Sequence, residues 1–406
     1  MKVDKSLLVP SLSGFQYGYN TSIIAGAILF ITTAFALNPF QEGMVVGAAM
    51  IGICLASFSA ILANYIGRKT TLFISVICFL TGTLISTFSP NYALLLVGRF
   101  IIGLGCGGAI VVAPTYLIEV APPESRGGAA NLNQVGIALG SLLAYLSSYL
   151  LSFSSSWRWM FALALIPAVV QFFGLFSIKE SVEKTAELAS SSWKNLIERS
   201  YLSRFKIVLL LTFLQALSGA NAIFFFAPTV FENVGFVGVE SSLLSTVFIG
   251  VVYLLSILVS FSIVDKFGRR FLLLTSFAGM GSCLLAIALV GFFQPPWLDT
   301  LSITCILLYI AFFALGVGPI PPIVINEISP LKVRAHAMTL MGAMGWVINY
   351  LIAISFLPMM KALSIEGTFM IYAFFCLLAL ILFFFKLPET KQKSLGEIER
   401  LFNSSG

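Results

Sequence analysis

Twelve apolar runs, separated by short polar connectors, dominate the sequence and restrict what it can fold into. About 20 helical residues cross the roughly 30 Å hydrocarbon core of a bilayer. The runs centre near residues 21, 54, 79, 106, 140, 168, 218, 252, 281, 313, 347 and 377. Hydrophobic residues make up 59% of the chain and charged residues 10%, too few charges to cover a large soluble core. The sequence therefore predicts an all-α polytopic membrane protein with twelve transmembrane helices in a lipid bilayer.

Positive charge is distributed unevenly among the connectors. If the N-terminus lies inside, all but three of the 23 Lys and Arg residues fall on the inner side, the exceptions being Arg99, Arg158 and Lys361. Connectors rich in Lys and Arg stay in the cytoplasm. We therefore predict a multi-pass protein of a plasma or bacterial inner membrane with both termini cytoplasmic. The net charge of +6 reflects this topology and gives no reason to expect a nucleic-acid partner.

The sequence repeats itself at a distance of about 200 residues. The pattern P-x4-E-x2-P-x3-R occurs at residues 114–126 and again at 322–334, an offset of 208. The turn at Gly67, Arg68 and Lys69 is echoed 201 residues later by a Gly-Arg-Arg turn. Two offsets of similar size indicate two related halves of six spans each, an arrangement that often places a binding site at the midplane between the halves.

These offsets give the predicted domain boundaries. One six-helix half occupies residues 1–178 and the other occupies 204–387. Residues 179–203 form the most charged stretch, whose spacing favours short amphipathic helices on the cytoplasmic face, with a disordered linker as the alternative. Residues 388–406 are predicted to be a cytoplasmic tail.

Charged side chains gather where the repeated motifs reach the cytoplasmic side. Arginines follow spans 2 and 8, and carboxylates end spans 4 and 10 with another arginine seven residues later. Carboxylates and guanidiniums at helix ends can form bidentate networks that latch the cytoplasmic side shut in one state; otherwise they only set topology. The candidate gating residues are Arg68, Glu119, Arg126, Asp265, Arg269, Glu327 and Arg334.

One charged residue is placed inside a span. Arg99 lies about 10 Å into a span that begins near Tyr92. An ionisable group at that depth is costly and marks a candidate functional site, unless it snorkels to the outer interface. All 17 acidic residues, in contrast, can be placed on connectors or at helix ends. A proton-coupled carrier needs a titrating group in its pathway, and Asn20 provides an amide instead.

Amides are the main polar groups within the spans. They offer both hydrogen-bond donors and acceptors, which suits a neutral polyhydroxylated solute, and an indole can stack on the ring of such a solute. Any single amide is equally consistent with hydrogen bonding between helices. The candidate solute-binding residues are Gln16, Asn20, Gln134, Gln215, Asn221, Trp346 and Asn349.

Catalytic chemistry finds little support in the sequence. The six cysteines all lie inside apolar spans at no metal-like spacing, which is typical of packing residues. His336 is the single histidine, too few for a metal site or a catalytic triad built on histidine. We therefore expect no enzyme activity, no metal and no cofactor.

Several longer motifs occur together over nearly the whole chain. They are GYNT, GRFIIGLGCG, P-x-Y-x-x-E-x-x-P-x-x-x-RG, NQ-x-G, Q-x-LSG-x-NA-x-F, DKFGRR, G-x-GPIP and PETK-x-x-S-x-x-EIE. In combination they resemble the sugar porter family of the major facilitator superfamily, including facilitative glucose transporters and bacterial sugar–proton symporters. The resemblance implies a major facilitator fold and alternating access to a hexose or pentose, by a protein that functions as a monomer.

The resemblance also implies roles for individual residues. In the family, the amides that match Gln134, Gln215, Asn221 and Asn349 hold the sugar. In the proton symporters an aspartate stands at the position of Asn20 and pairs with the arginine that matches Arg99. Facilitative glucose transporters have asparagine at that position, as this chain does.

The chain departs from the family pattern at several positions. Ala216 replaces the second glutamine of the span 7 motif, Pro322 replaces a tryptophan of span 10, and Gly345 replaces the asparagine before Trp346. These changes leave fewer sugar-binding groups and weaken the case for D-glucose. Tyr65 replaces an arginine, and the Pro-Glu-Ser-Pro-Arg motif after span 6 is reduced, which predicts a weaker inner latch in the first half.

Facilitative sugar uniport is the leading functional interpretation. The nearest alternative is a proton-coupled sugar symporter that uses an unrecognised carboxylate. A non-transporting sugar sensor on the same fold is a third hypothesis, and a transporter of another small organic solute is a fourth.

Overall fold

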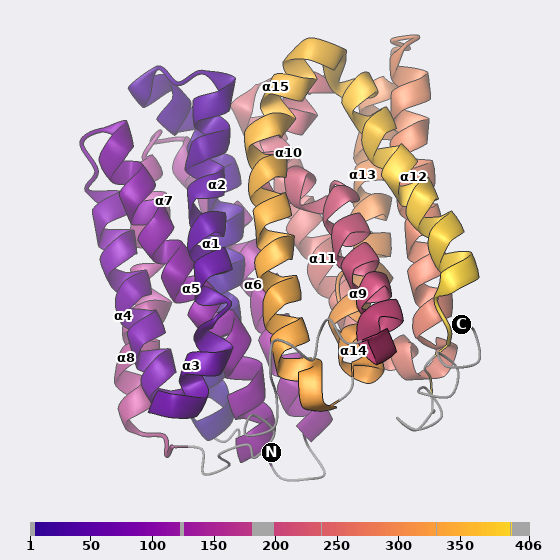
Figure 1. Ribbon diagram of the computed structural model, residues 1–406. Coiled ribbons are helices and arrows are strands. Elements are labelled where there is room, and N and C mark those ends of the chain that lie inside the picture. The colour runs from indigo at the N-terminus through magenta and orange to yellow at the C-terminus, as the bar shows by residue number, and fades with distance from the viewer. Residues whose placement is uncertain are drawn as a thin grey trace.

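The chain folds into a bundle of long helices, for which a computed structural model describes residues 5–121, 126–180, 199–236, 238–329, 331–389 and 391. Every regular element within these ranges is a helix (Figure 1). A bilayer offers no hydrogen-bond partner to the backbone, so a spanning segment must satisfy its own amides and carbonyls, as a helix does. The all-α prediction is confirmed.

The first half and the second half follow each other along the chain (Figure 1). The helices of the first half are α1 (Lys5–Phe35), α2 (Pro39–Ala56), α3 (Ser59–Ile66), α4 (Arg68–Thr87), α5 (Tyr92–Val120), α6 (Arg126–Ser152), α7 (Trp157–Ala162) and α8 (Leu165–Phe176). Those of the second half are α9 (Arg199–Leu217), α10 (Ala220–Asn233), α11 (Val239–Phe267), α12 (Arg269–Gly291), α13 (Leu298–Phe312), the π-helix η4 (Phe313–Val317), α14 (Ile320–Ile328) and α15 (Leu331–Lys386).

Eleven segments of the described chain are long and apolar enough to cross a membrane. The last of them, His336–Lys386, has 51 residues, more than twice the length needed for one crossing. It bends at Ser364, whose φ of 61° interrupts α15. This bent segment therefore provides two spans, and the sequence prediction of twelve agrees with the structure.

The spans alternate in direction, so α1 begins and α15 ends at the same face, the lower one in Figure 1. We call this the terminal face and the other the opposite face. At the opposite face the two halves are in close contact. A Cβ atom at Gly43 of α2 would lie 2.6 Å from Cα of Ile354 in α15, and one at Gly47 would lie 2.7 Å from the ring of Tyr350. Small residues allow this close approach of helices.

Two spans near the middle of the molecule are interrupted. Between α9 and α10, Gly219 adopts a φ of +89°, a conformation that glycine tolerates without a steric penalty. Between α13 and α14, the π-helix η4 precedes Pro319, which cannot donate a backbone hydrogen bond. Irregular backbone at membrane depth is tolerated where it is buried in protein or lines a cavity, and both breaks lie beside the cavity described below.

Candidate functional site

A cavity of about 350 Å³ lies between the two halves. Helices α1, α5 and α6 line it from the first half, and α9, α10, α11, α14, α15 and the η4 region line it from the second. Four of the predicted solute-binding amides and the predicted indole are among the lining residues: Gln134, Gln215, Asn221, Trp346 and Asn349. The helical packing thus brings together side chains that are up to 215 residues apart in the sequence.

The cavity extends towards the terminal face. In α15 the lining runs from Asn349 back to Met341 and Met338 near the start of the helix, and in α14 it includes Ile325 near the end. Both of these helix ends lie at the terminal face. Because α2 and α15 are packed together at the opposite face, the structure is open towards the terminal face and closed at the opposite one.

The amides of the second half are held by hydrogen bonds within that half. Gln215 donates through Nε2 to the carbonyl oxygen of Val317 at 2.9 Å, a carbonyl at the end of η4. Asn221 donates to Oδ1 of Asn349 at 2.5 Å, and Asn349 donates to the carbonyl oxygen of Gly345 at 2.9 Å. These bonds fix the orientation of the amides and leave the oxygens of Gln215 and Asn221 to accept hydrogen bonds from a solute.

The first half presents a single amide to the cavity. Gln134 of α6 is half-buried, and among the described residues no group is hydrogen-bonded to its side chain. Its nitrogen and oxygen can therefore both bind a solute hydroxyl without breaking a bond inside the protein. Gln134 and the second-half amides line the same cavity.

Aromatic rings form much of the remaining wall. Tyr17 contacts Trp346 edge to face, with ring centroids 5.9 Å apart, and this contact joins α1 to α15. Phe224 contacts Tyr253 with centroids 5.1 Å apart. Flat apolar rings suit the faces of a pyranose or furanose ring, while the amides suit its hydroxyls. All charged side chains of the described residues lie outside the lining, which favours a neutral solute.

Two of the proposed binding residues do not line the cavity. Gln16 is 2% exposed and donates to Oε1 of Gln171 at 2.7 Å, and Gln171 donates to Ser13 at 2.7 Å. These bonds join α1 to α8. Gln16 therefore makes hydrogen bonds between helices, which was the alternative to solute binding for each amide. Asn20 is also 2% exposed and faces Arg99.

The sequence reasoning missed several lining residues on α1 and α6. Tyr17 and Thr21 are four residues apart and share the stripe of α1 that faces the cavity. Gln16 and Asn20 have the same spacing but occupy the neighbouring stripe, turned towards α5 and α8. Ser141 lines the cavity seven residues after Gln134, again on one face of a helix. Helical periodicity from Gln134 would have identified it.

Three of the departures from the family pattern lie in the cavity wall. Ala216, Pro322 and Gly345 are lining residues. Each replaces a larger polar or indole side chain by one that offers no side-chain hydrogen bond. The wall is consequently more apolar at these positions than the family pattern implies.

Arg99 is deeply buried within the first half. The residue is 1% exposed, so its side chain does not snorkel to the interface. Nη1 donates to Oδ1 of Asn20 at 2.6 Å, and Nε donates to the carbonyl oxygen of Val45 at 3.3 Å. The guanidinium also lies 5.8 Å from the ring centroid of Phe161. These three partners are all neutral, and the amide of Asn20 stands where a carboxylate would form an ion pair.

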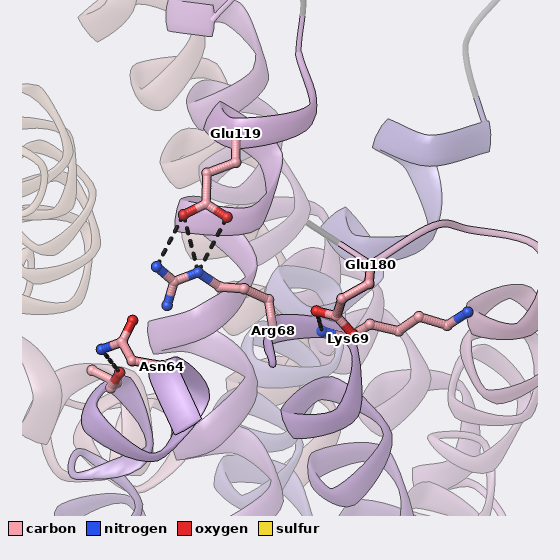
Figure 2. A network of polar contacts seen from close by, with 6 residues as sticks. Asn64, Arg68, Lys69, Glu119 and Glu180 are labelled. Atoms are coloured by element: carbon pink, nitrogen blue, oxygen red, sulfur yellow. Dashed lines mark hydrogen bonds and ion pairs between the residues drawn. The ribbon is translucent and has the colours of Figure 1, made fainter. Parts of the chain in front are cut away.

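The first of the two predicted latches lies at the terminal face between α4 and α5 (Figure 2). Glu119 accepts from Nε of Arg68 through both oxygens, at 3.0 and 3.2 Å, and one oxygen lies 2.9 Å from Nη2. The side chains are 11% and 9% exposed. The expectation of a weaker first latch is therefore not supported by the described contacts, which are bidentate and nearly buried.

The second latch repeats the geometry with fewer contacts among the described residues. Nε of Arg269 lies 3.2 Å from one oxygen of Glu327, and the side chains are 16% and 26% exposed. The other oxygen of Glu327, Oε2, is buried and makes no hydrogen bond with the described residues. The side chains of the remaining candidate gating residues, Arg126, Asp265 and Arg334, lie outside the described part of the structure.

Two further glutamates, which the sequence reasoning missed as site residues, cap the helices that carry these arginines. Glu180 accepts from the backbone N–H of Lys69 at 2.9 Å (Figure 2). Glu389 accepts from the backbone N–H groups of Arg269 and Arg270 at 3.0 and 3.1 Å. A carboxylate at a helix N-terminus satisfies free amides and complements the helix dipole. Their separation of 209 residues, close to the other two offsets, could have identified them.

Comparisons with known proteins agree with this geometry. The profile of the family described as "Sugar (and other) transporter" matches residues 6–188 and 178–402. A glucose transporter of Staphylococcus epidermidis is 34% identical over 98% of this chain and 97% of its own length. A galactose-proton symporter of Escherichia coli is 30% identical over 96% of this chain and 92% of its own length.

Solved structures show the same architecture. A D-xylose-proton symporter superposes with a TM-score of 0.85 and 27% identity, over 97% of this chain and all of the other. The xylose transporter XylE from E. coli, in an inward-open conformation, gives a TM-score of 0.83 at 26% identity, over 97% of this chain and 98% of the other. Motifs, cavity and full-length similarity lead to one conclusion: the chain belongs to the sugar transporter family of the major facilitator superfamily.

Proposed function

We propose that this sugar transporter is a facilitative uniporter of a neutral monosaccharide, a hexose or a pentose. The observation that carries the proposal is the 2.6 Å hydrogen bond between Arg99 and Asn20. An amide does not titrate, so this position cannot take up or release a proton during the cycle. The arginine keeps its charge at physiological pH, and its role is to hold α1, α2 and α5 together.

The proposed solute site consists of Gln134, Gln215, Asn221, Trp346 and Asn349. Supporting this assignment, all five line one cavity whose described lining residues carry no charge. A neutral polyol can donate hydrogen bonds to the side-chain oxygens of Gln215 and Asn221. Gln134 offers it both a hydrogen-bond donor and an acceptor. Gln16 and Asn20 are proposed to have structural roles outside the solute site, as hydrogen bonds from α1 to α8 and α5. One chain encloses the cavity, which supports a monomeric transporter.

The second latch at the terminal face is proposed to control access, and the first is proposed to hold its own half together. That face is proposed to be cytoplasmic, because the connectors rich in Lys and Arg belong to it. In the present open state, Arg68–Glu119 and Arg269–Glu327 each stay within one half. The oxygen of Glu327 that makes no hydrogen bond with the described residues is available to a donor from the first half when the face closes.

Proton-coupled symport is the second candidate, and the relatives support it. Two of the proteins compared above are named as proton symporters. Symport would require a titrating carboxylate in the pathway. The described cavity wall contains none, which is why uniport is preferred.

Uptake into proteoliposomes tests the two candidates directly. Purified protein is reconstituted, and a panel of labelled hexoses and pentoses is offered with and without an imposed pH gradient. Uniport predicts that the accepted sugar equilibrates and never exceeds the external concentration, whatever the gradient. Accumulation above that concentration, driven by the gradient and abolished by a protonophore, would establish symport. Binding of a sugar without any uptake would establish a sensor.

A further inference from the structure

A proline removes one backbone hydrogen bond from α10 at the edge of the cavity. Pro228 has no N–H group, so the carbonyl of Phe224, four residues earlier, loses its helical donor. The backbone is correspondingly kinked at Phe226, where φ is −123° and ψ is 22°. A buried carbonyl without a donor is unfavourable, and Phe224 is 8% exposed.

A tyrosine of the other half provides the missing donor. The hydroxyl of Tyr145 in α6 donates to the carbonyl oxygen of Phe224 at 2.9 Å. Tyr145 is 1% exposed. Its ring lies against Gly250 of α11, where a Cβ atom would come within 3.2 Å of the ring. The second half therefore supplies both a hydrogen-bond acceptor and a surface for one side chain of the first half.

This contact lies at the end of the cavity that is nearest the opposite face. Ser141, one helical turn before Tyr145, lines the cavity, and so does Phe224. Helix α6 runs from the terminal face towards the opposite face, so Tyr145 lies beyond Ser141 on the closed side. The hydrogen bond consequently joins the two halves just where the path from the cavity to the opposite face is closed.

We propose that Tyr145 is a positioning residue for alternating access, and that its hydroxyl stabilises closure of the opposite face by bonding the carbonyl that Pro228 leaves free. When the halves separate at that face, the bond breaks and water entering the gap can hydrate the carbonyl. Loss of the hydroxyl thus destabilises only the closed arrangement. The proposal depends on neither the identity of the sugar nor the choice between uniport and symport.

Accessibility from the opposite face tests the proposal in the full-length protein in nanodiscs. The reporter is Leu243→Cys, because Leu243 of α11 is 1% exposed and its side chain would lie 3.2 Å from a Cβ atom at Gly26 of the first half. Tyr145→Phe keeps the ring and removes the donor. We expect it to speed labelling of the reporter by a membrane-impermeant maleimide about 3- to 10-fold.

Tyr309→Phe is the matched control. The hydroxyl of Tyr309 donates to the carbonyl oxygen of Ser218, also at 2.9 Å and also buried, but both residues belong to the second half. Its loss should change the melting temperature and leave the labelling rate within twofold of the parent. An equal increase in both variants would overturn the proposal, because it would indicate general loosening.

A double-mutant cycle with Pro228→Ala distinguishes the mechanism from a packing effect. Alanine restores the N–H group, so the Phe224 carbonyl regains its helical donor and no longer needs the tyrosine. Tyr145→Phe should then change labelling by less than twofold in the Pro228→Ala background. An undiminished effect there, or no effect in the parent, would overturn the proposal. If Tyr145→Phe alone fails to fold, failure of Pro228→Ala to restore folding would overturn it as well.

Discussion

The two halves carry the same motifs but differ in how far their polar groups are satisfied. In the first half, both oxygens of Glu119 bind Arg68 and the pair is nearly buried. In the second half, one oxygen of Glu327 binds Arg269, and the other makes no hydrogen bond with the described residues. The amides differ in the opposite sense, since Gln134 in the first half has no hydrogen bond with the described residues and Gln215 in the second half is bonded to Val317.

The difference indicates a division of roles. Groups that are already satisfied within one half hold that half together and do not depend on the state of the transporter. Groups that keep a free donor or acceptor can bind something that arrives, either the other half or a solute. We therefore expect Glu119 and Gln215 to be mainly structural, and Glu327 and Gln134 to be mainly responsive.

The largest expected effect is on stability. Glu119→Gln should lower the free energy of unfolding by about 3 kcal/mol, because it removes the carboxylate that pairs with the nearly buried guanidinium of Arg68. Glu327→Gln should cost about 1 kcal/mol, because its pair is more exposed. Unfolding in detergent, followed by tryptophan fluorescence, measures both. Equal losses would remove the structural distinction between the two latches.

The second effect is on the conformational equilibrium. Glu327→Gln should shift the population towards the arrangement open at the terminal face by about 2 kcal/mol, because the closed arrangement loses a charge-assisted hydrogen bond to the free oxygen. Labelling of Met341→Cys from the terminal face reports the change. Glu119→Gln is the matched control and should leave the labelling rate within twofold. A larger shift from Glu119→Gln would reverse the assignment of roles.

Much of this comparison could be predicted from the sequence. Hydrophobic length predicted the spans, and the repeated Gly-Arg and Glu-x2-Pro-x3-Arg patterns predicted the halves and put Arg68 and Glu119 in one cluster of charges at the cytoplasmic side. Both signals are local, because each depends on a helix of known rise ending at a membrane surface. The same reasoning placed Arg99 inside a span, where the structure has it.

The orientation of helix faces could not be predicted in the same way. Residues 16 and 20 form one polar stripe of α1, and residues 17 and 21 form another only 100° away. Which stripe faces the cavity depends on how α1 packs against α6 and α8, and this is a tertiary property. The partners Val45 and Val317 contribute backbone carbonyls. Every residue has such a carbonyl, so the sequence carries no sign of them.

The third effect concerns solute affinity. Gln134→Ala should weaken binding of the accepted sugar by about 1.5 kcal/mol, or roughly tenfold, since its amide has no competing partner inside the protein. Gln215→Ala should weaken binding about threefold, because the side-chain nitrogen of Gln215 already donates to the carbonyl oxygen of Val317. Equilibrium binding to detergent-solubilised protein measures both, with Gln16→Ala as the control that should not change affinity. A larger loss in Gln215→Ala would show that the bonded amide is the main sugar contact.

The smallest expected effect is that of a proton gradient, which should not change sugar uptake at all. Arg99 and Asn20 form a buried cation–amide pair, and neither partner changes its charge between pH 5 and 8. The amount of sugar taken up at steady state should therefore be the same with and without a protonophore.

Asn20→Asp gives a matched variant, because it places a carboxylate beside the guanidinium without changing the size of the side chain. In that variant the rate of sugar exchange should vary with pH while the parent rate stays constant. Residue 20 of the first half would then respond to protons, just as we expect Glu327 of the second half to respond to closure. A parent that accumulates sugar under an imposed gradient would show instead that a carboxylate other than residue 20 drives symport.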